Sequence, residues 1–165
     1  MITRTAKLLL LAGIALFYTL VVFNNLTDFD SNYQFVRHVL MMDSTFPGKH
    51  GQWRAVPSPV VHRMFYIGII AWEIATAALL WWGAVRLLQA LRLPATAFHR
   101  AKRISIMALT LSMLMWLVAF LTVGAEWFLM WQSHIWNGQE AAFRMFAVVG
   151  IILLILMQPE TESQP

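Results

Sequence analysis

Four apolar stretches, separated by polar segments, dominate the pattern of the chain. They cover residues 8–23, 64–85, 104–125 and 141–157, and the charged residues inside them are Glu73 and Arg144. A helix that crosses the hydrocarbon core of a bilayer needs about 20 mainly apolar residues, within a range of about 17–25. The second and third stretches reach this length, whereas the other two must include flanking residues. We therefore predict membrane-spanning helices at residues 6–25, 60–86, 103–128 and 140–158.

The segment between the first two spans, residues 26–59, has a pattern of its own. Apolar residues recur there at helical spacing in two interleaved sets: Tyr33, Val36 and Leu40, and Phe35, Val39 and Met42. This spacing predicts an amphipathic helix at about residues 32–42 that lies on the membrane surface, with Ser31 at its start in capping-box spacing to Gln34. Ser58 is the predicted cap of the second span and Pro59 its first helical residue.

The composition supports a membrane protein. Of the 165 residues, 59% are hydrophobic and 12% are charged. Soluble domains average about 45–50% apolar and about 25% charged residues, so a water-soluble globule is excluded. Cys is absent, which excludes disulfides, thiolate metal sites and a cysteine nucleophile. We therefore predict an all-α membrane protein in which residues 1–165 form one domain with four transmembrane helices.

The distribution of charge predicts the orientation of the chain. Five Lys or Arg residues and no acidic residue lie between Arg86 and Arg103, in the connection between the second and third spans. Cytoplasmic loops carry such an excess of Lys and Arg. We therefore expect cytoplasmic N and C termini and an extracytoplasmic first loop. We expect no nucleic-acid partner, because the positive charges lie between two apolar spans and no basic face with aromatic residues beside it is visible.

Glu73 is the most informative polar residue. It lies about 13 residues into the second span, which is about 19 Å deep at 1.5 Å per residue, and straight helices would place Trp116 at the same depth. A charged residue at this depth costs roughly 2.5–3.5 kcal/mol on insertion scales, so it is expected to face a bundle or a cavity. We consider Glu73, Trp72 and Trp116 a candidate buried polar site. A protonated Glu73 that only ties helices together is the structural alternative.

A second expectation concerns Glu126 and Arg144. If the third span extends to about Trp131 and the fourth begins near Gln139, each residue lies about five positions inside its helix, at the two sides of the last hairpin. Equal depth on antiparallel neighbours predicts an ion pair, because an unpaired charge in a low dielectric costs several kcal/mol. A structural clamp is the favoured interpretation, and an anion site that uses Arg144 is the alternative.

The histidines and methionines raise the question of a cofactor. His38, Met41 and Met42 share one face of the predicted surface helix, which suits copper, and His62 and His134 share a level at which a haem could be held. No recognised ligand spacing supports either site. We therefore expect no metal and no cofactor. We interpret the methionines as packing at the membrane interface and the histidines as solvated polar residues.

Three stretches carry a resemblance to a known family. They are residues 23–43, with Asn24-Asn25 and Asp28, then Trp72-Glu73, and then residues 126–139. The chain resembles a bacterial family of predicted small integral membrane proteins that is known as a domain of unknown function. The resemblance implies four helices in a bacterial inner membrane and supplies no reaction. Together with the extracytoplasmic placement, it marks an outer-loop binding surface made of Asn24, Asn25, Asp28, His38, Asp43, Trp131, Gln132, Trp136 and Asn137.

The sequence leaves several classes of function open. The leading expectation is a non-enzymatic accessory or binding protein, because polar detail is rich on the predicted outer face and no catalytic motif is present. The alternatives are a small transporter that uses Glu73 as a proton- or ion-coupled site and a quinone- or haem-linked redox subunit. The expected partners are the lipid bilayer and either another membrane protein or a second copy of the chain.

Overall fold

The computed structural model describes residues 1–47 and 51–160, and within these ranges the regular structure is entirely helical. Three of its elements are short or unusual: two 3₁₀ turns and one π-helix, η2. In chain order the elements are α1 (Ile2–Thr27), α2 (Phe29–Met41), η1 (Gln52–Arg54), α3 (Pro59–Ala90), α4 (Ala95–Leu114), η2 (Met115–Trp127), η3 (Met130–Gln132) and α5 (Gln139–Met157).

The predicted fold class is confirmed. Four helical segments of the described chain are long and apolar enough to cross a membrane, namely α1, α3, α4 continued by η2, and α5. The connection that was expected as a basic loop is mostly helical, because α3 continues to Ala90 and α4 begins at Ala95. The orientation of the loops and termini stays a prediction.

Two predicted helix starts have different outcomes. α3 begins with Pro59 after Ser58, as expected from the fixed φ of proline and its missing N–H group. The predicted start of the surface helix at Ser31 is wrong, because α2 begins at Phe29 after Asp28. Ser31 lies within the first turn and donates a hydrogen bond from its hydroxyl to Asp28 Oδ2, at 2.7 Å.

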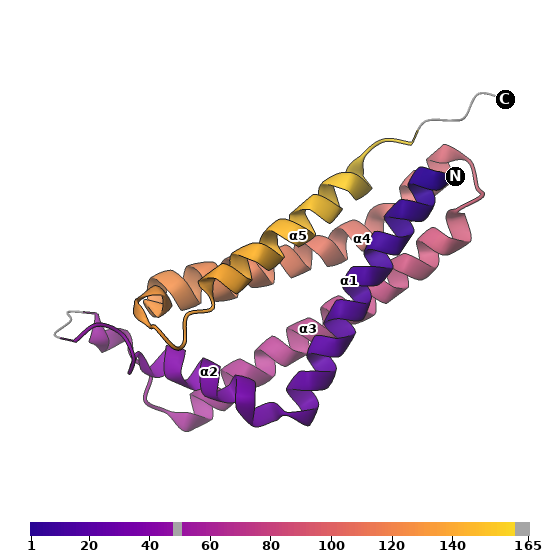
Figure 1. Cartoon of the computed structure of the whole chain (residues 1–165). Coiled ribbons are helices and arrows are strands. Elements are labelled where there is room, and N and C mark those ends of the chain that lie inside the picture. Colours follow the sequence, from indigo (N-terminus) through magenta and orange to yellow (C-terminus); the bar gives the residue numbers. More distant parts are fainter. Residues whose placement is uncertain (48–50, 161–165) are drawn as a thin grey trace.

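The helices form a bundle that is closed at one end and open at the other (Figure 1). α3 packs against both α1 and α4, and α5 packs against α4 and η2. The start of α1 and the end of α5 lie together at the closed end, which we call the terminal end. Toward the other end the pair α1 and α3 diverges from η2 and α5, and α2 lies there, so we call it the capped end.

A close helix approach holds the terminal end together. A Cβ atom added to Gly83 of α3 would lie 2.5 Å from Ser105 Oγ and 3.1 Å from the Ser105 backbone. Small residues of this kind let membrane helices pack tightly. α3 and α4 therefore touch through their backbones at this level.

The buried apolar side chains form two clusters. The larger one lies among α1, α3, α4 and α5 and includes Leu11, Leu80, Leu109 and Val149. The smaller one joins α2 to α3 and to the segment after η2, through Val39, Ile70, Phe128 and Met130.

The π-helix η2 continues α4 over 13 residues. Its wider turns are marked by the hydrogen bond from Phe128 N to Val123 O and by the bond from the Thr122 hydroxyl to Leu117 O, each spanning five residues. π-helices are rare, usually a single turn long, and often found at functional sites. The apolar periodicity alone did not distinguish η2 from an α-helix.

We expect Gly83→Ala to destabilise the protein by about 1–3 kcal/mol, because the new methyl group would overpack the contact with Ser105. Thermal unfolding in detergent measures the effect. Gly13→Ala is the matched control, since its Cβ would meet no atom within 4 Å. Equal stability of the two variants would contradict the close contact.

Candidate functional site

A chain of hydrogen bonds links three helices around Glu73. The Glu73 side chain of α3 is buried, with 4% of its surface exposed. Asn25 of α1 donates from Nδ2 to Glu73 Oε2 at 2.6 Å, and Asn32 of α2 donates from Nδ2 to Asn25 Oδ1 at 2.6 Å. The carboxyl group therefore connects the cap helix α2 to the bundle through Asn25.

A second polar group lies on the side of α4. The Trp116 indole N–H donates to Tyr18 Oη at 2.9 Å, and the Tyr18 and Ser112 hydroxyl groups share a hydrogen bond of 2.6 Å. Trp72 points elsewhere and donates from its indole to Leu111 O at 3.1 Å. Trp72 and Trp116 were the two predicted partners of Glu73. Trp116 lines the same hollow as Glu73, which is described next, whereas Trp72 joins α3 to α4.

A hollow of about 250 Å³ lies beside these groups. Its lining combines apolar side chains with the polar side chains of Asn25, Asn32, Tyr66, Glu73 and Trp116. Tyr66 is 2% exposed, and its hydroxyl makes no hydrogen bond of standard geometry with the described residues, although the Asn32 side chain lies close enough to interact with it. A buried hydroxyl without a partner costs about 1–3 kcal/mol, so a polar group in this hollow would be stabilised.

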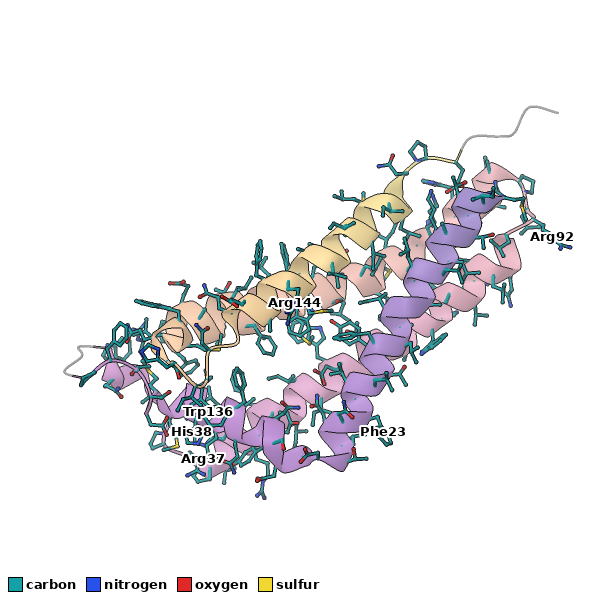
Figure 2. The ribbon with its side chains drawn as sticks, viewed as in Figure 1. Phe23, Arg37, His38, Arg92, Trp136 and Arg144 are labelled. Carbon is teal, nitrogen blue, oxygen red and sulfur yellow. The ribbon has the colours of Figure 1, made fainter. Side chains whose placement is uncertain are left out.

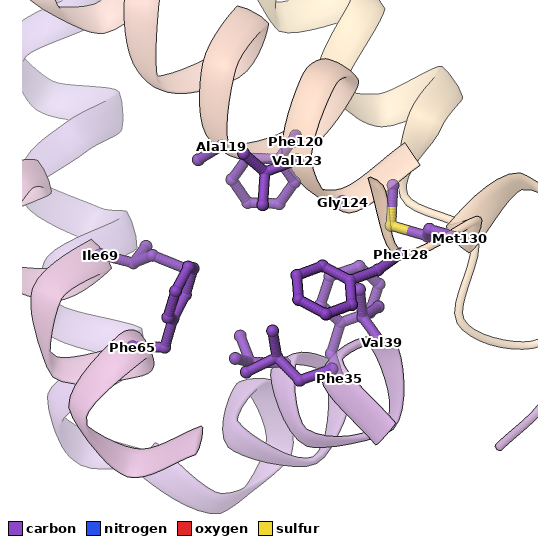
Figure 3. A pocket seen from close by; sticks show the side chains of 12 residues that line it. Phe35, Val39, Phe65, Ile69, Ala119, Phe120, Val123, Gly124, Phe128 and Met130 are labelled. Carbon is purple, nitrogen blue, oxygen red and sulfur yellow. The ribbon is translucent and has the colours of Figure 1, made fainter. Parts of the chain in front are cut away.

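The polar hollow is next to two apolar hollows, the larger of which lies between α3 and η2. A narrow hollow of about 40 Å³ shares Phe35, Ile69 and Phe120 with the polar hollow. It also shares Phe65, Ala119 and Val123 with an open hollow of about 530 Å³. Figure 3 shows the narrow part, with side chains of α3 facing those of η2. We call these three neighbouring hollows together the cleft.

The cap is fastened over the cleft by aromatic and polar contacts. The rings of His38 and Trp136 stack with centroids 4.6 Å apart and planes 7° apart (Figure 2). His38 Nδ1 also contacts Asp43 Oδ2 at 2.7 Å, and Phe35 packs against the edge of Trp136. α2 is therefore held to the connection before α5 as well as to Asn25.

Most residues of the predicted outer-loop surface make contacts within the chain. Gln132 Oε1 accepts a hydrogen bond from Phe46 N at 3.2 Å, and Asn137 Oδ1 accepts one from Gln139 N at 3.0 Å. Trp131 packs edge-on against Phe46, whereas Asn24 is exposed. These side chains hold the loops of the capped end together, and a role in binding a partner stays a prediction.

The side chains considered for copper or haem are spread over different environments. Met42 is buried in the smaller apolar cluster, and Met41 is half-buried. His62 donates from Nε2 to Val56 O at 2.6 Å, while His134 is exposed. Within the described residues no group of three His, Asp or Glu side chains is placed to hold a metal ion.

The predicted ion pair between Glu126 and Arg144 is wrong. Both side chains are exposed, and no ion pair within the described residues joins them. The prediction matched the depths of the two residues but assumed the faces on which they lie. Glu126 is in η2, where five-residue turns replace the α-helical register on which that assumption rested.

A charged cluster lies at the terminal end, and the sequence did not predict it. Lys7 Nζ and Lys102 Nζ both contact Glu160 Oε1, at 2.6 and 2.5 Å, and both donate to Gln158 O, at 2.9 and 2.8 Å. Arg4 Nε lies 3.4 Å from Glu160 Oε2. Lys102 is fully buried although it comes from the stretch that was read as a basic loop.

The electrostatic environment of Glu160 favours its charged form. Burial by itself raises the pKa of this carboxyl group, but hydrogen bonds from Lys102 and Lys7 and the charges of these two lysines outweigh burial. The pKa of Glu160 is therefore held below its ordinary value. Glu160 acts as a charged latch between the segment after α5 and the helices α1 and α4.

The chain matches one family of membrane proteins over nearly its whole length. A family model described as "Predicted small integral membrane protein (DUF2165)" matches residues 3–159. No curated protein and no solved structure is significantly similar to the chain. The matched region contains the cleft and the hydrogen-bonded chain around Glu73.

We expect Asn25→Ala to lower the free energy of unfolding by about 1–3 kcal/mol, because the buried Glu73 carboxyl group loses its donor and Asn32 loses its acceptor. Thermal unfolding in detergent checks this expectation. Asn24→Ala is the neighbouring control at an exposed position and should change stability by less than about 0.5 kcal/mol. The role of Asn25 would be refuted if both variants behaved like the parent protein.

Glu160 predicts a specific dependence of stability on pH. Because its folded-state pKa is lowered, its contribution is fully present above the ordinary Glu pKa of about 4.3 and is lost as the pH falls through the folded-state value. We expect Glu160→Gln to be less stable than the parent protein at neutral pH. The difference should shrink in acid, as measured by unfolding at a series of pH values; a difference that stays constant would argue against the latch.

Proposed function

Because the chain belongs to the family of predicted small integral membrane proteins DUF2165 and has polar groups at the end of an apolar cleft, we propose that it is a non-enzymatic binding protein. Its ligand is a molecule dissolved in the membrane, with a long apolar part and a neutral hydrogen-bonding end. The observation that carries this proposal is that three neighbouring hollows with shared lining residues follow one another from the surface of α3 and η2 to Glu73 and Tyr66.

The size and lining of the cleft support a small-molecule site. Ligand pockets typically measure about 300–1,000 Å³ and combine many apolar side chains with a few polar groups that orient the ligand. The open hollow of about 530 Å³ has an apolar lining, and the polar hollow of about 250 Å³ supplies the few polar groups. An elongated amphipathic molecule matches this order.

The polar end of the cleft favours a neutral head group. The Tyr66 hydroxyl can donate one hydrogen bond and accept another, and with the described residues it makes no hydrogen bond of standard geometry, Asn32 being its nearby polar neighbour. Glu73 is the one ionisable acid in the cleft lining, and its Oε2 is held by Asn25. A carbonyl or hydroxyl group of a ligand would satisfy Tyr66, whereas an anion would be repelled by an ionised Glu73.

The position of the opening favours entry from the bilayer. Val61, Met64 and Phe65 line the open hollow and are 39%, 67% and 43% exposed. All three belong to α3, one of the helices long and apolar enough to span a membrane. Apolar side chains at such positions face lipid, so a membrane-dissolved ligand can reach the cleft without crossing water.

The location of the protein is part of the proposal. We place it in the cytoplasmic membrane of a bacterium, with both ends of the chain on the cytoplasmic side. This orientation rests on the basic stretch from Arg86 to Arg103, which lies at the terminal end together with the start of α1. The capped end then lies on the opposite side of the membrane.

The test uses the molecules that stay bound during purification. Protein isolated in lipid nanodiscs is extracted with solvent, and the extract is analysed by mass spectrometry. We expect a species that is retained by the parent protein and lost in Ala119→Leu, because the larger side chain fills the cleft. Ala71→Leu is the matched control at an exposed position of α3 outside the cleft lining.

Tyr66→Phe separates binding from folding. Removing a buried hydroxyl that makes no hydrogen bond of standard geometry should leave the unfolding temperature unchanged or raised, while retention of the ligand falls about 2- to 10-fold, as expected for one lost hydrogen bond. Identical extracts from the parent protein and Ala119→Leu would contradict binding. A proton flux in proteoliposomes that Glu73→Gln abolishes would favour transport instead.

A further inference from the structure

The charged cluster at the terminal end has an excess of positive charge in a shielded place. We call Arg4, Lys7 and Lys102 the cage. Lys102 is 0% exposed and Lys7 is 6% exposed, and both ammonium groups share the single oxygen atom Glu160 Oε1. Both ammonium groups also donate to the neutral carbonyl of Gln158, and the Lys102 ammonium lies 5.7 Å from the centre of the Phe98 ring.

Three cations surround one carboxylate in the cage. Buried charges are stable when they are paired, and an unpaired one costs several kcal/mol. Within residues 1–47 and 51–160, a single negative charge on Glu160 leaves the three cations of the cage under-neutralised. Glu160 is also the one acidic residue that the described part of the chain brings to the terminal end, where Arg92 and Arg100 add further positive charge.

We propose that the cage is a binding site for a dianionic phosphate group and that Glu160 is its displaceable internal occupant. A phosphate monoester carries about −1.5 to −2 charges at pH 7 and has three strong acceptor oxygens, so it matches three cationic donors better than one carboxylate does. Basic sites between membrane helices are known to hold lipid head groups.

The surroundings of Glu160 offer a path for this exchange. A hollow of about 400 Å³ is lined by Glu160 and Pro159 on one side and by Thr96, His99 and Arg100 of α4 on the other. Displacement of Glu160 opens the cage toward this hollow. Arg100 is exposed and has no ion-pair partner among the described residues, so it can contact the same phosphate group at the entrance.

The phosphate group can come from a lipid or from solution, and the experiment separates the two sources. Purified protein in a neutral detergent is titrated with dihexanoyl phosphatidic acid, with inorganic phosphate and with dihexanoyl phosphatidylcholine, and binding is followed by calorimetry. We expect phosphatidic acid to bind and phosphatidylcholine not to bind. Binding of inorganic phosphate with similar affinity would assign the site to the free ion, and binding of phosphatidic acid alone would assign it to the lipid.

The variant Glu160→Gln tests the displacement. If Glu160 occupies the cage about 90% of the time, removing its charge tightens phosphate binding about tenfold. Glu140→Gln removes the same charge from the start of α5 at the other end of the bundle and should leave the affinity unchanged. A gain of equal size in both variants would show a nonspecific effect of net charge and would overturn the proposal.

Loss of a cage residue tests the site itself. Lys102→Gln, made in the Glu160→Gln background so that no lone carboxylate is left buried, should abolish the binding gained by Glu160→Gln. Arg4→Gln is a second variant at a less buried position, with 13% of its side chain exposed. Unchanged phosphate binding in a folded cage variant, or no phosphate binding by Glu160→Gln, would overturn the proposal.

Discussion

The hydrogen bond from Asn25 to Glu73 is the interaction on which the capped end depends. A carboxyl group buried among membrane helices must be satisfied by a neighbouring donor, and Asn25 supplies it from α1 at 2.6 Å. The same amide accepts a bond from Asn32, so the position of the cap helix α2 follows from the position of Glu73. One requirement of physical chemistry thus fixes α1, α2 and α3 relative to one another.

This arrangement gives the two ends of the bundle different properties. At the terminal end, close backbone contact at Gly83 and the Glu160 latch keep the helices together. At the capped end, the hydrogen-bonded chain and the His38–Trp136 stack support α2, while α3 and η2 stay apart around the cleft. A rigid closed end and a capped open end are suited to holding a molecule without closing the bundle around it.

The sequence predicted the features that follow from composition and from the depth of a residue within its helix. Length and hydropathy predicted the four helices, and the depth of Glu73 singled it out as a polar residue in an apolar span. Asn25 was expected in an outer-loop surface, because nothing in one sequence tells which way the end of a helix faces. The wrong pairing of Glu126 with Arg144 has the same origin, since equal depth does not imply facing side chains.

The burial of Lys102 and the π-helical turns of η2 were not predicted by the pattern of apolar and charged residues. Lys102 lies in a run of positive charges that predicts a solvated loop, and its partner Glu160 is about 58 positions away in a short acidic tail. η2 has the same apolar pattern as an α-helix, so its wider turns left no mark in the sequence. The contact of Lys102 with Glu160 joins segments that are distant in the sequence, which local propensity does not record.

We propose that the cleft between α3 and η2 is an occupied binding site that ends at Glu73 and Tyr66. An experimental structure of the protein in nanodiscs made from its native membrane tests this proposal. We expect continuous density for an elongated molecule, entering beside Met64 and ending within hydrogen-bonding distance of the Tyr66 hydroxyl. A structure in which α3 and η2 pack directly together, with Phe65 and Val123 in contact and the cleft closed, would contradict it.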